Sequence, residues 1–187
     1  MPGEAGGRAV AEVLFGDVEP TGRLPVTFPR AVGRLPVSYD QKRARADADD
    51  HIDLPSTPLF PFGAGLGHTT FRHGRIRLTD DTIKADATTR VRVDLTNTGQ
   101  RAGTEVVQLY VTDEQTSVSL PYIRLRGVRK VRVEPGKRAT VTFDLVPSRD
   151  LTLVDGDMRT VVEPGTFEIR VERSSTDVRR RAVLRVI

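Results

Sequence analysis

A two-residue alternation of apolar and polar side chains from about Arg75 to Ile187 is the feature that most constrains the fold of this chain. Such alternation is typical of β-strands that bury one face. Turn sequences separate the segments, among them Glu134-Pro135-Gly136-Lys137. About seven short strands at this spacing predict a mainly β, immunoglobulin-like sandwich. The absence of Trp and Cys excludes an antibody-type domain. The alternating apolar residues are Ile76 and Leu78; Val91, Val93 and Leu95; Val107, Leu109 and Val111; Val131 and Val133; Val141, Phe143 and Leu145; Phe167, Ile169 and Val171; and Ala182, Leu184 and Val186.

The first third of the chain is predicted to hold one helix and one short extended segment, which cannot enclose a core by themselves. The helix is expected over Glu4–Phe15, with Gly16 as its C-terminal stop. Leu24–Pro29 is expected to be extended, but its two prolines exclude full pairing as a central strand. This third is therefore interpreted as the end of a larger domain, with an exposed apolar surface. That surface is expected to comprise Ala9, Val10, Val13 and Leu14 of the helix stripe, with Leu24, Val26 and Phe28.

Composition and charge argue against several classes of protein. Apolar residues make up 37% and charged residues 29% of the chain, which is typical of a soluble domain that leans polar. The net charge of +4 comes from interleaved Arg and acidic residues, so no nucleic-acid partner is expected. No apolar run approaches the roughly 18 residues of a membrane span, so no membrane partner is expected either. Met1-Pro2-Gly3-Glu4 does not begin a signal peptide. The compartment stays open, and the chain would be cytoplasmic if expressed as it stands.

Two groups of residues suggest a ligand, and for each a structural interpretation is preferred. An acidic cluster with one His could bind a hard or borderline cation. It has no turn Gly and no closing bidentate Glu, so an exposed acidic loop is predicted. Gly63, Gly65 and Gly67 are spaced as in a phosphate loop, but no buried strand precedes them and no helix follows. A packed, Gly-turned crossing between domains is predicted there instead. The acidic cluster comprises Asp47, Asp49, Asp50, His51 and Asp53.

No arrangement of residues for catalysis is visible in the sequence. No Ser lies in a Gly-x-Ser-x-Gly elbow, and the three His residues lack the spacing of a zinc hydrolase. Glu4 is assigned to the helix N-terminus, where free N–H groups stabilise a carboxylate. Glu105 precedes an apolar strand and Asp155 lies in a turn, so both are expected to face solvent. We therefore assign no catalytic, substrate-binding or metal-binding residue to this chain, and we expect no cofactor.

Two stretches near the N-terminus, GEAGGRAVAEVLFGD at 3–17 and PTGRLPVTFP at 20–29, closely resemble a known family. They are similar to the end of the second domain of family 3 glycoside hydrolases, the β-glucosidases and their relatives. After Phe62-Gly63 the family usually has Tyr-Gly-Leu-Ser-Tyr, whereas this chain has AGLGH at 64–68, so no role of that loop is carried over. The match continues in order through Tyr39, Lys42, Arg45, Ile52-Asp53-Leu54-Pro55 and Pro58-Leu59-Phe60-Pro61-Phe62-Gly63.

The remainder resembles the fibronectin type III-like domain that ends many of these enzymes. The resemblance therefore implies three segments: a terminal fragment of the family's α/β domain at 1–36, an irregular linker at 37–72, and a fibronectin type III-like sandwich at 73–187. The segments that carry it are Asn97-Thr98-Gly99, Ala102-Gly103, Glu105-Val106-Val107-Gln108-Leu109-Tyr110-Val111, Leu125-Arg126-Gly127-Val128 and Val162-Glu163-Pro164-Gly165.

The resemblance implies a parent enzyme that hydrolyses O-glycosidic bonds by a retaining mechanism. Such a mechanism needs two carboxylates about 5–5.5 Å apart. In the family the nucleophilic Asp lies in an N-terminal barrel and the acid/base lies earlier in the second domain, so both would be upstream of Met1. Met1 is then expected to be an internal Met, or a start placed inside a longer or broken frame. The chain alone is predicted to be inactive and structural.

The missing barrel and α/β domain are the partners that the resemblance implies, and self-association through the exposed stripe is expected in their absence. The alternative is a stand-alone fibronectin type III-like binding or assembly module. A carbohydrate platform needs exposed aromatic side chains, and this chain offers only three Tyr and seven Phe, several of them at core positions. The enzyme-fragment interpretation is therefore preferred.

Overall fold

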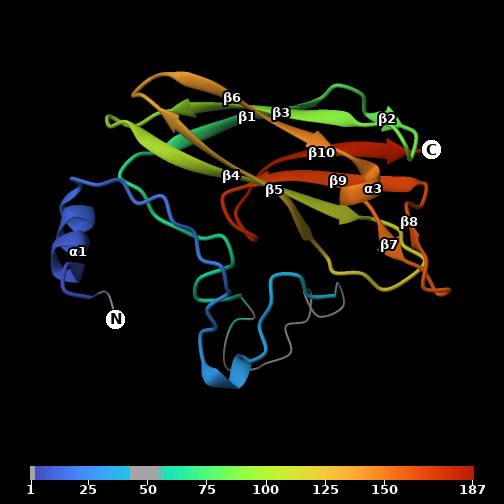
Figure 1. The fold of residues 1–187 in the computed structure, drawn as a ribbon, viewed down its shortest axis with the longest axis horizontal. Helices are drawn as coiled ribbons and strands as arrows, with labels where there is room; N and C mark the ends of the chain where they lie inside the picture. The colour runs from blue at the N-terminus through green and yellow to red at the C-terminus, as the bar shows by residue number, and fades with distance from the viewer. Residues whose placement is uncertain (1–2, 43–54, 56) are drawn as a thin grey trace.

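The computed structural model describes residues 3–42, 55 and 57–187 and shows a two-layer β-sandwich approached by an N-terminal arm (Figure 1). The larger sheet has the strand order β2-β10-β9-β4-β5, and the smaller has the order β1-β3-β6. Within the described residues, seven strands span eight or more residues, which confirms the predicted sandwich. The long strands are β1 (Phe71–Leu78), β3 (Thr89–Asn97), β4 (Gly103–Asp113), β5 (Arg124–Val133), β6 (Arg138–Leu145), β9 (Gly165–Glu172) and β10 (Val178–Val186).

Short elements fill the edges and the ends of the sandwich. The strand β2 (Thr82–Ile83) pairs with β10 in parallel, whereas the long strands pair antiparallel. A one-turn helix, α3 (Pro147–Asp150), follows β6 and begins with Pro at its first position, where the missing N–H costs nothing. A small hairpin of β7 (Leu153–Val154) and β8 (Thr160–Val161) completes this end of the molecule.

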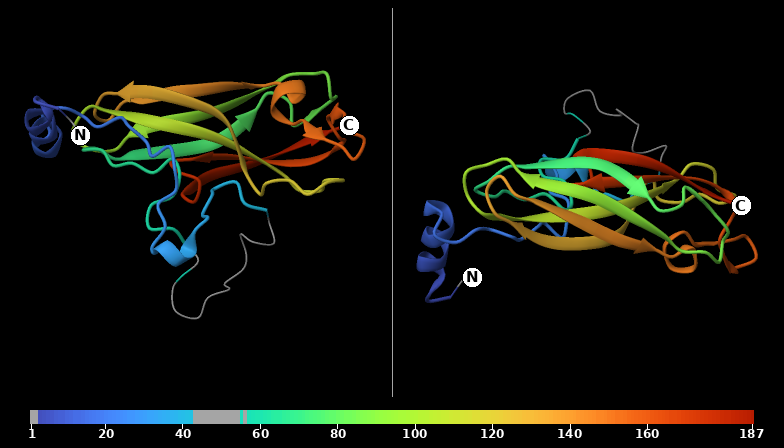
Figure 2. Two further views of the ribbon diagram at one scale, coloured as in Figure 1. Left: turned by 60° about the horizontal axis from the view of Figure 1, so that its bottom comes forward. Right: turned by 90° about the horizontal axis from the view of Figure 1, so that it is seen from above.

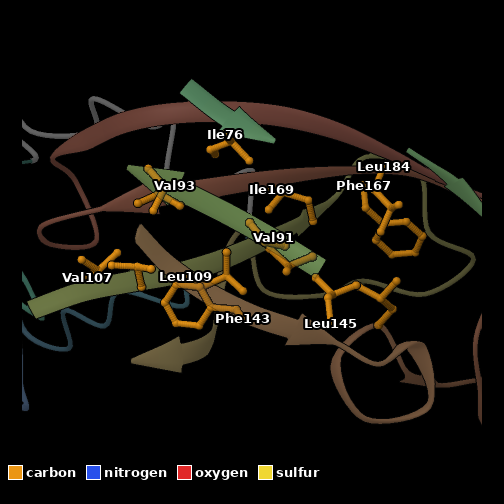
Figure 3. Packing of buried hydrophobic residues seen from close by; sticks show 14 of the residues in the cluster. Ile76, Val91, Val93, Val107, Leu109, Phe143, Leu145, Phe167, Ile169 and Leu184 are labelled. Atoms are coloured by element: carbon orange, nitrogen blue, oxygen red, sulfur yellow. The ribbon is translucent and has the colours of Figure 1, made fainter. Parts of the chain in front are cut away.

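The core lies between the two sheets and is built from the alternating positions (Figure 3). In β3, Val91, Val93 and Leu95 are fully buried, while the residues between them point away from the core. Burying an aliphatic side chain of this size contributes about 1.5–3 kcal/mol, so this layer supplies the main driving force for folding. Residues from the other strands that meet β3 in the core include Ile76, Val107, Leu109, Phe143, Leu145, Phe167, Ile169 and Leu184.

The strand β4 departs from one-sided burial, because residues 105–112 are all buried. One set of side chains, Val107, Leu109 and Val111, belongs to the core. The intervening residues Val106 and Tyr110 are 2% and 0% exposed, although they lie outside the core cluster. The N-terminal arm covers this second face, so β4 is buried on both faces.

The described residues before β1, namely 3–42, 55 and 57–70, form the arm, which begins with α1 (Gly6–Phe15). The helix starts two residues later than predicted and ends at Gly16 as predicted. Gly16 is left-handed with φ of 86°, and the N–H groups of Asp17 and Val18 donate to Glu12 O. Its exposed side chains include Val10 at 52% and Leu14 at 71%, which confirms the exposed apolar stripe at these residues.

After α1 the arm runs beside the sandwich as an irregular, paired ribbon (Figure 2). Leu24 N–H donates to Ala64 O at 2.9 Å, and Phe28 N–H donates to Phe60 O at 2.8 Å. This limited pairing agrees with the prediction that the two prolines exclude a regular strand. A single 3₁₀ turn, η1 (Val32–Arg34), follows. Of the helices in the described part of the chain, none is long and apolar enough to cross a membrane.

His73 of β1 should make the sandwich sensitive to acid. Its side chain is buried, and neither ring nitrogen has a hydrogen-bond partner. Burial, reinforced by Arg179 and Arg173, lowers the pKa of His73 from 6.5 to about 4. Between these two pKa values His73 is protonated in the unfolded chain but neutral in the folded chain. The free energy of unfolding therefore falls as the pH drops from about 6.5 towards 4. The expected loss is about 3 kcal/mol, from about 1.4 kcal/mol per pKa unit.

His73→Phe tests this, because it keeps an aromatic ring and removes the titration. Urea unfolding at several pH values between 4 and 7 should show a flatter dependence of unfolding free energy on pH for the variant. Equal slopes for the two proteins would contradict the assignment.

Candidate functional site: the junction of arm and sandwich

Several buried polar and charged groups lie together where the arm meets β4 and the turn after β9. The described residues contain no group of three or more His, Cys, Asp or Glu that could hold a metal ion. The acidic cluster Asp47, Asp49, Asp50, His51 and Asp53 lies outside the described residues. His68 is used structurally, because its ring Nε2 lies 2.8 Å from Val13 O and its backbone N–H donates to the Glu19 carboxylate.

Glu105 is the centre of the junction, and the expectation that it faces solvent is wrong. Its side chain is completely buried. Glu105 Oε1 lies 3.3 Å from Arg23 Nη2 of the arm, and Oε2 lies 3.5 Å from Arg173 Nε in the turn after β9. Oε1 also accepts the Val106 N–H at 3.1 Å. The arm and the turn close over this carboxylate, and two guanidinium groups compensate its desolvation.

Asp155 is likewise less exposed than predicted, although it does lie in the turn between β7 and β8. Its Oδ1 accepts the N–H groups of Asp157 and Arg159, both at 2.9 Å. These backbone hydrogen bonds, the one from Arg159 above all, hold the pKa of the Asp155 carboxyl below its usual value. The carboxylate shapes the turn and takes no part in the junction.

Gln108 of β4 ties the arm to the sandwich through one side-chain amide. Its Nε2 donates to Gly63 O at 3.0 Å and to Arg173 O at 2.8 Å, and its Oε1 accepts the Tyr110 hydroxyl at 2.7 Å. Gly63 is left-handed with φ of 80°, and a Cβ on it would lie 2.2 Å from Gln108 Oε1. Gly63 therefore makes a close packing contact with β4, which agrees with the prediction that this segment is packed rather than a phosphate loop.

Aromatic side chains seal the junction from the side of the arm. The Tyr39 ring stacks on Phe62 with centroids 4.2 Å apart, and it meets the edge of Tyr110 at 6.1 Å. Such pairs are worth about 0.5–1.5 kcal/mol beyond their buried area. Burial raises the pKa of the Tyr110 phenol, so this group stays a hydrogen-bond donor to Gln108.

A hollow of about 290 Å³ lies beside these rings, between the arm and the sandwich. Tyr39, Tyr122 and Arg170 are among its lining residues. The Arg170 guanidinium stacks 4.9 Å from the Tyr122 ring centroid and bonds the Glu168 carboxylate and the Tyr122 hydroxyl. Its charge and donors are thus engaged within the protein, and the lining residues in the described part of the chain include no carboxylate, whereas glycoside cleavage needs two.

Glu172 at the end of β9 is the second fully buried carboxyl group of this region. Its Oε1 lies 4.0 Å from Arg170 Nη1, and neither oxygen has a hydrogen-bond partner. Burial raises the pKa of Glu172 from 4.5 to about 8, against the opposing effect of Arg170. The group is therefore mainly protonated at neutral pH, which avoids an uncompensated buried charge.

Sequence reasoning missed the residues that build this junction, namely Arg23, Gln108 and Arg173. The sequence of β4 did contain a clue. Val106 and Tyr110 are apolar or aromatic at positions that should be polar if the outer face of β4 were exposed to solvent. An apolar run on both faces of a strand indicates that something covers the outer face. The identity of the cover was not visible, because Arg23 and Glu105 are 82 positions apart in the sequence.

Comparison with known proteins matches both parts of this architecture. Residues 1–68 match the glycosyl hydrolase family 3 C-terminal domain, and residues 105–175 match a fibronectin type III-like domain. The chain is 43% identical to a β-xylosidase of Formosa agariphila over 175 residues, and 36% identical to a periplasmic β-glucosidase of Salmonella typhimurium over 187 residues. These alignments cover 92% and 95% of this chain, and 24% of each relative.

Solved structures show the same relationship. A β-glucosidase from Erythrobacter marinus superimposes with a TM-score of 0.92 at 41% identity, over the whole of this chain and 24% of that one. A β-glucosidase from Listeria innocua, solved with glucose, gives a TM-score of 0.86 at 28% identity, over 97% of this chain and 26% of that one. The chain spans about a quarter of the length of the relatives it matches.

These findings define a fibronectin type III-like sandwich joined to the closing segment of a larger enzyme domain. Its first third matches the C-terminal domain of glycosyl hydrolase family 3, and the whole chain corresponds to the C-terminal part of β-glucosidases of that family. The resemblance drawn from the sequence is confirmed.

Replacing Gly63 with Ala should destabilise the junction more than the same change at another left-handed glycine. At Gly63 the new Cβ meets strained backbone and also collides with Gln108, so the expected cost is about 2–4 kcal/mol. Gly136 has φ of 67° with nothing within 4 Å of the new Cβ, so Gly136→Ala should cost only about 1–2 kcal/mol. Chemical unfolding of both variants measures the difference, and equal losses would show that the contact with Gln108 carries no energy.

Glu172 should make stability depend on pH in the opposite direction to His73. Because its folded pKa is raised, its stabilising protonation is complete below pH 4.5 and is lost as the pH rises towards 8. The expected loss across this interval is up to about 4 kcal/mol. Glu172→Gln should remove it, whereas Glu134→Gln in an exposed turn should not. Unfolding curves at pH 5 and pH 8 measure this difference in unfolding free energy. If Glu172→Gln loses as much stability between the two pH values as the wild type, Glu172 is not its source.

Proposed function

We propose that this chain is the C-terminal module of a β-glucosidase-type enzyme, and that its own role is structural. The relatives named above include β-glucosidases and a β-xylosidase, which supports hydrolysis of a β-linked gluco- or xylo-configured glycoside by the whole enzyme. The retaining mechanism uses two carboxylates about 5–5.5 Å apart. The two buried carboxyl groups of the junction are not proposed to supply them, because Glu105 is paired with two arginines and both side chains are closed off from solvent.

One observation carries this proposal. The arm makes hydrogen bonds, an ion pair and aromatic contacts with the sandwich, whereas α1 at its start exposes apolar side chains to solvent. Val10, Leu14 and Phe15 of α1 are 52%, 71% and 82% exposed. An apolar groove along α1, lined by Ala5, Ala9 and Val13 among others, accompanies them. Exposed apolar patches of this kind mark interfaces. The rest of the α/β domain is the occupant that the family match supports.

We further propose the division that the sequence suggested. Residues 1–36 would complete the α/β domain, residues 37–72 would connect it, and residues 73–187 would form the sandwich. In this arrangement Glu105, Gln108 and the aromatic seal fix the position of the arm. The sandwich therefore acts as a clamp that holds the last segment of the α/β domain against the enzyme.

The chain on its own should not hydrolyse aryl β-glucosides or aryl β-xylosides. The catalytic carboxylates are proposed to lie outside it, so release of nitrophenol should stay at the level of a buffer blank. The measurement needs a parallel preparation from host cells that lack the chain, which reports contaminating glycosidase. Turnover that co-purifies with the chain and exceeds that control would overturn the proposal.

The bare face of α1 should make the chain self-associate. Replacing Val10 and Leu14 with Ser should reduce the apparent mass in light scattering, because it removes the exposed apolar surface. Val154→Ser with Met158→Ser is the matched control, since both residues are exposed but lie in the β7–β8 hairpin. A chain that is monomeric at high concentration, or a control that disperses it equally well, would show that α1 is not the interface.

A further inference from the structure

The outer face of the three-stranded sheet β1-β3-β6 carries a concentration of arginine. In β3 the outward positions alternate with the buried Val91, Val93 and Leu95, so one face collects every second residue. Residues directly opposite on β1 and β6 share that face. Hydroxyl groups lie between the charges. The face comprises Arg72, Arg77, Arg90, Arg92 and Arg138, with Asp94, Asp144, Thr96, Thr140 and Thr142.

The two aspartates neutralise only part of this charge. Arg77 Nη2 lies 2.9 Å from Asp94 Oδ2, and Arg90 Nε lies 3.1 Å from Asp144 Oδ1. In the part of the chain that the structure describes, the other three arginines form no ion pair or side-chain hydrogen bond. These three, called the arginine triad, are Arg72, Arg92 and Arg138, and all of them are exposed.

The register places these charges where they repel one another. Arg77 lies directly opposite Arg92 across β1 and β3, and like charges at opposed positions destabilise a sheet. Thr96 lies between Arg72 and Arg138 in one cross-strand row, so two guanidinium groups flank one hydroxyl. Sites where the sequence departs from the locally most stable choice are often functional, so these like charges indicate a binding surface.

This face and most of the arm lie on opposite sides of the sandwich. Figure 1 shows the three-stranded sheet along the upper side of the sandwich and the arm along the lower side. The arm contacts Gln108 and Tyr110 on the other sheet, and α1 extends beyond one end. The arm therefore covers the other sheet, whereas α1 lies beyond one end of the sandwich, where Val13 O is 2.8 Å from Nε2 of His68.

We propose that this face binds an acidic polysaccharide, a linear glycan that carries uronate carboxylates. Guanidinium groups match carboxylates in a planar, two-pronged geometry, and threonine hydroxyls can exchange hydrogen bonds with sugar hydroxyls. Neighbouring strands lie about 4.8 Å apart, so the face offers a regular array of cations to a polymer with regularly repeated anions. The choice of a glycan rests on the proposed function, because a glycosidase gains from being held on a polymer that contains its substrate.

Other polyanions fit the same surface less well. Binding of single-stranded nucleic acid uses aromatic side chains that stack on bases, and none of the residues of this face is aromatic. Sequence reading of a duplex needs an element that enters a groove, whereas this face is a sheet surface. An anionic membrane would favour apolar residues beside the cations, and the face carries threonines there instead.

Affinity electrophoresis of the full 187-residue chain in gels that contain polygalacturonate tests the proposal. Retardation is expected at low salt, it should weaken as salt is added, and neutral xylan should give none. The variant Arg72→Gln, Arg92→Gln, Arg138→Gln should bind about tenfold more weakly, in line with the loss of three exposed charge contacts. The matched control is Lys130→Gln, Arg132→Gln, Arg185→Gln, which removes the same charge from exposed positions on β5 and β10 and should bind within about twofold of the wild type.

Three results would overturn the proposal: no retardation by polygalacturonate at low salt, equal losses in the two triple variants, or retardation by duplex DNA as strong as by the glycan. A thermal unfolding curve for each variant confirms that the sandwich is intact, which the exposure of all six residues leads us to expect. The electrophoresis does not involve hydrolysis, so a negative result leaves the proposed glycosidase function to its own activity test.

Discussion

The placement of the arm depends on one buried carboxylate. Glu105 lies inside the protein, where an isolated charge would cost several kcal/mol. Arg23 and Arg173 compensate that cost, and they come from opposite ends of the sequence. The charge of the carboxylate is therefore compensated from both sides only when β4, the arm and the turn after β9 are all in place. The contacts of Gln108 and the aromatic seal follow from the same closure.

The sequence was sufficient for the fold but only partly for the junction. Alternation in β3 and β9 specifies the sandwich, because buried faces require a period of two. Gly16 specifies the end of α1, since a left-handed residue favours glycine. Glu105 could not be placed in this way, because its burial depends on tertiary partners and its local pattern resembles that of an exposed strand start. Its environment became visible only with Arg23 and Arg173 in position.

The two outer faces of the sandwich differ in chemistry, because one contacts the arm and the other exposes charged side chains to solvent. On one side β4 presents Val106, Gln108 and Tyr110 to the arm, in a contact that buries all three side chains. On the other side β3 presents Arg90 and Arg92 to solvent. A single sheet sandwich thus separates an internal structural surface from a charged external one, and each can change without disturbing the core between them.

The close fit of Gly63 against Gln108 also bears on how such enzymes recombine. Boundaries between domains generally fall in the exposed linkers that join them. Here the segment before β1 is built into the surface of the domain, so a crossover placed at the start of the sandwich would expose Gln108, Tyr110 and Glu105 to water without their partners. A functional transfer would have to carry the arm as well, and the inherited unit is therefore longer than the sandwich itself.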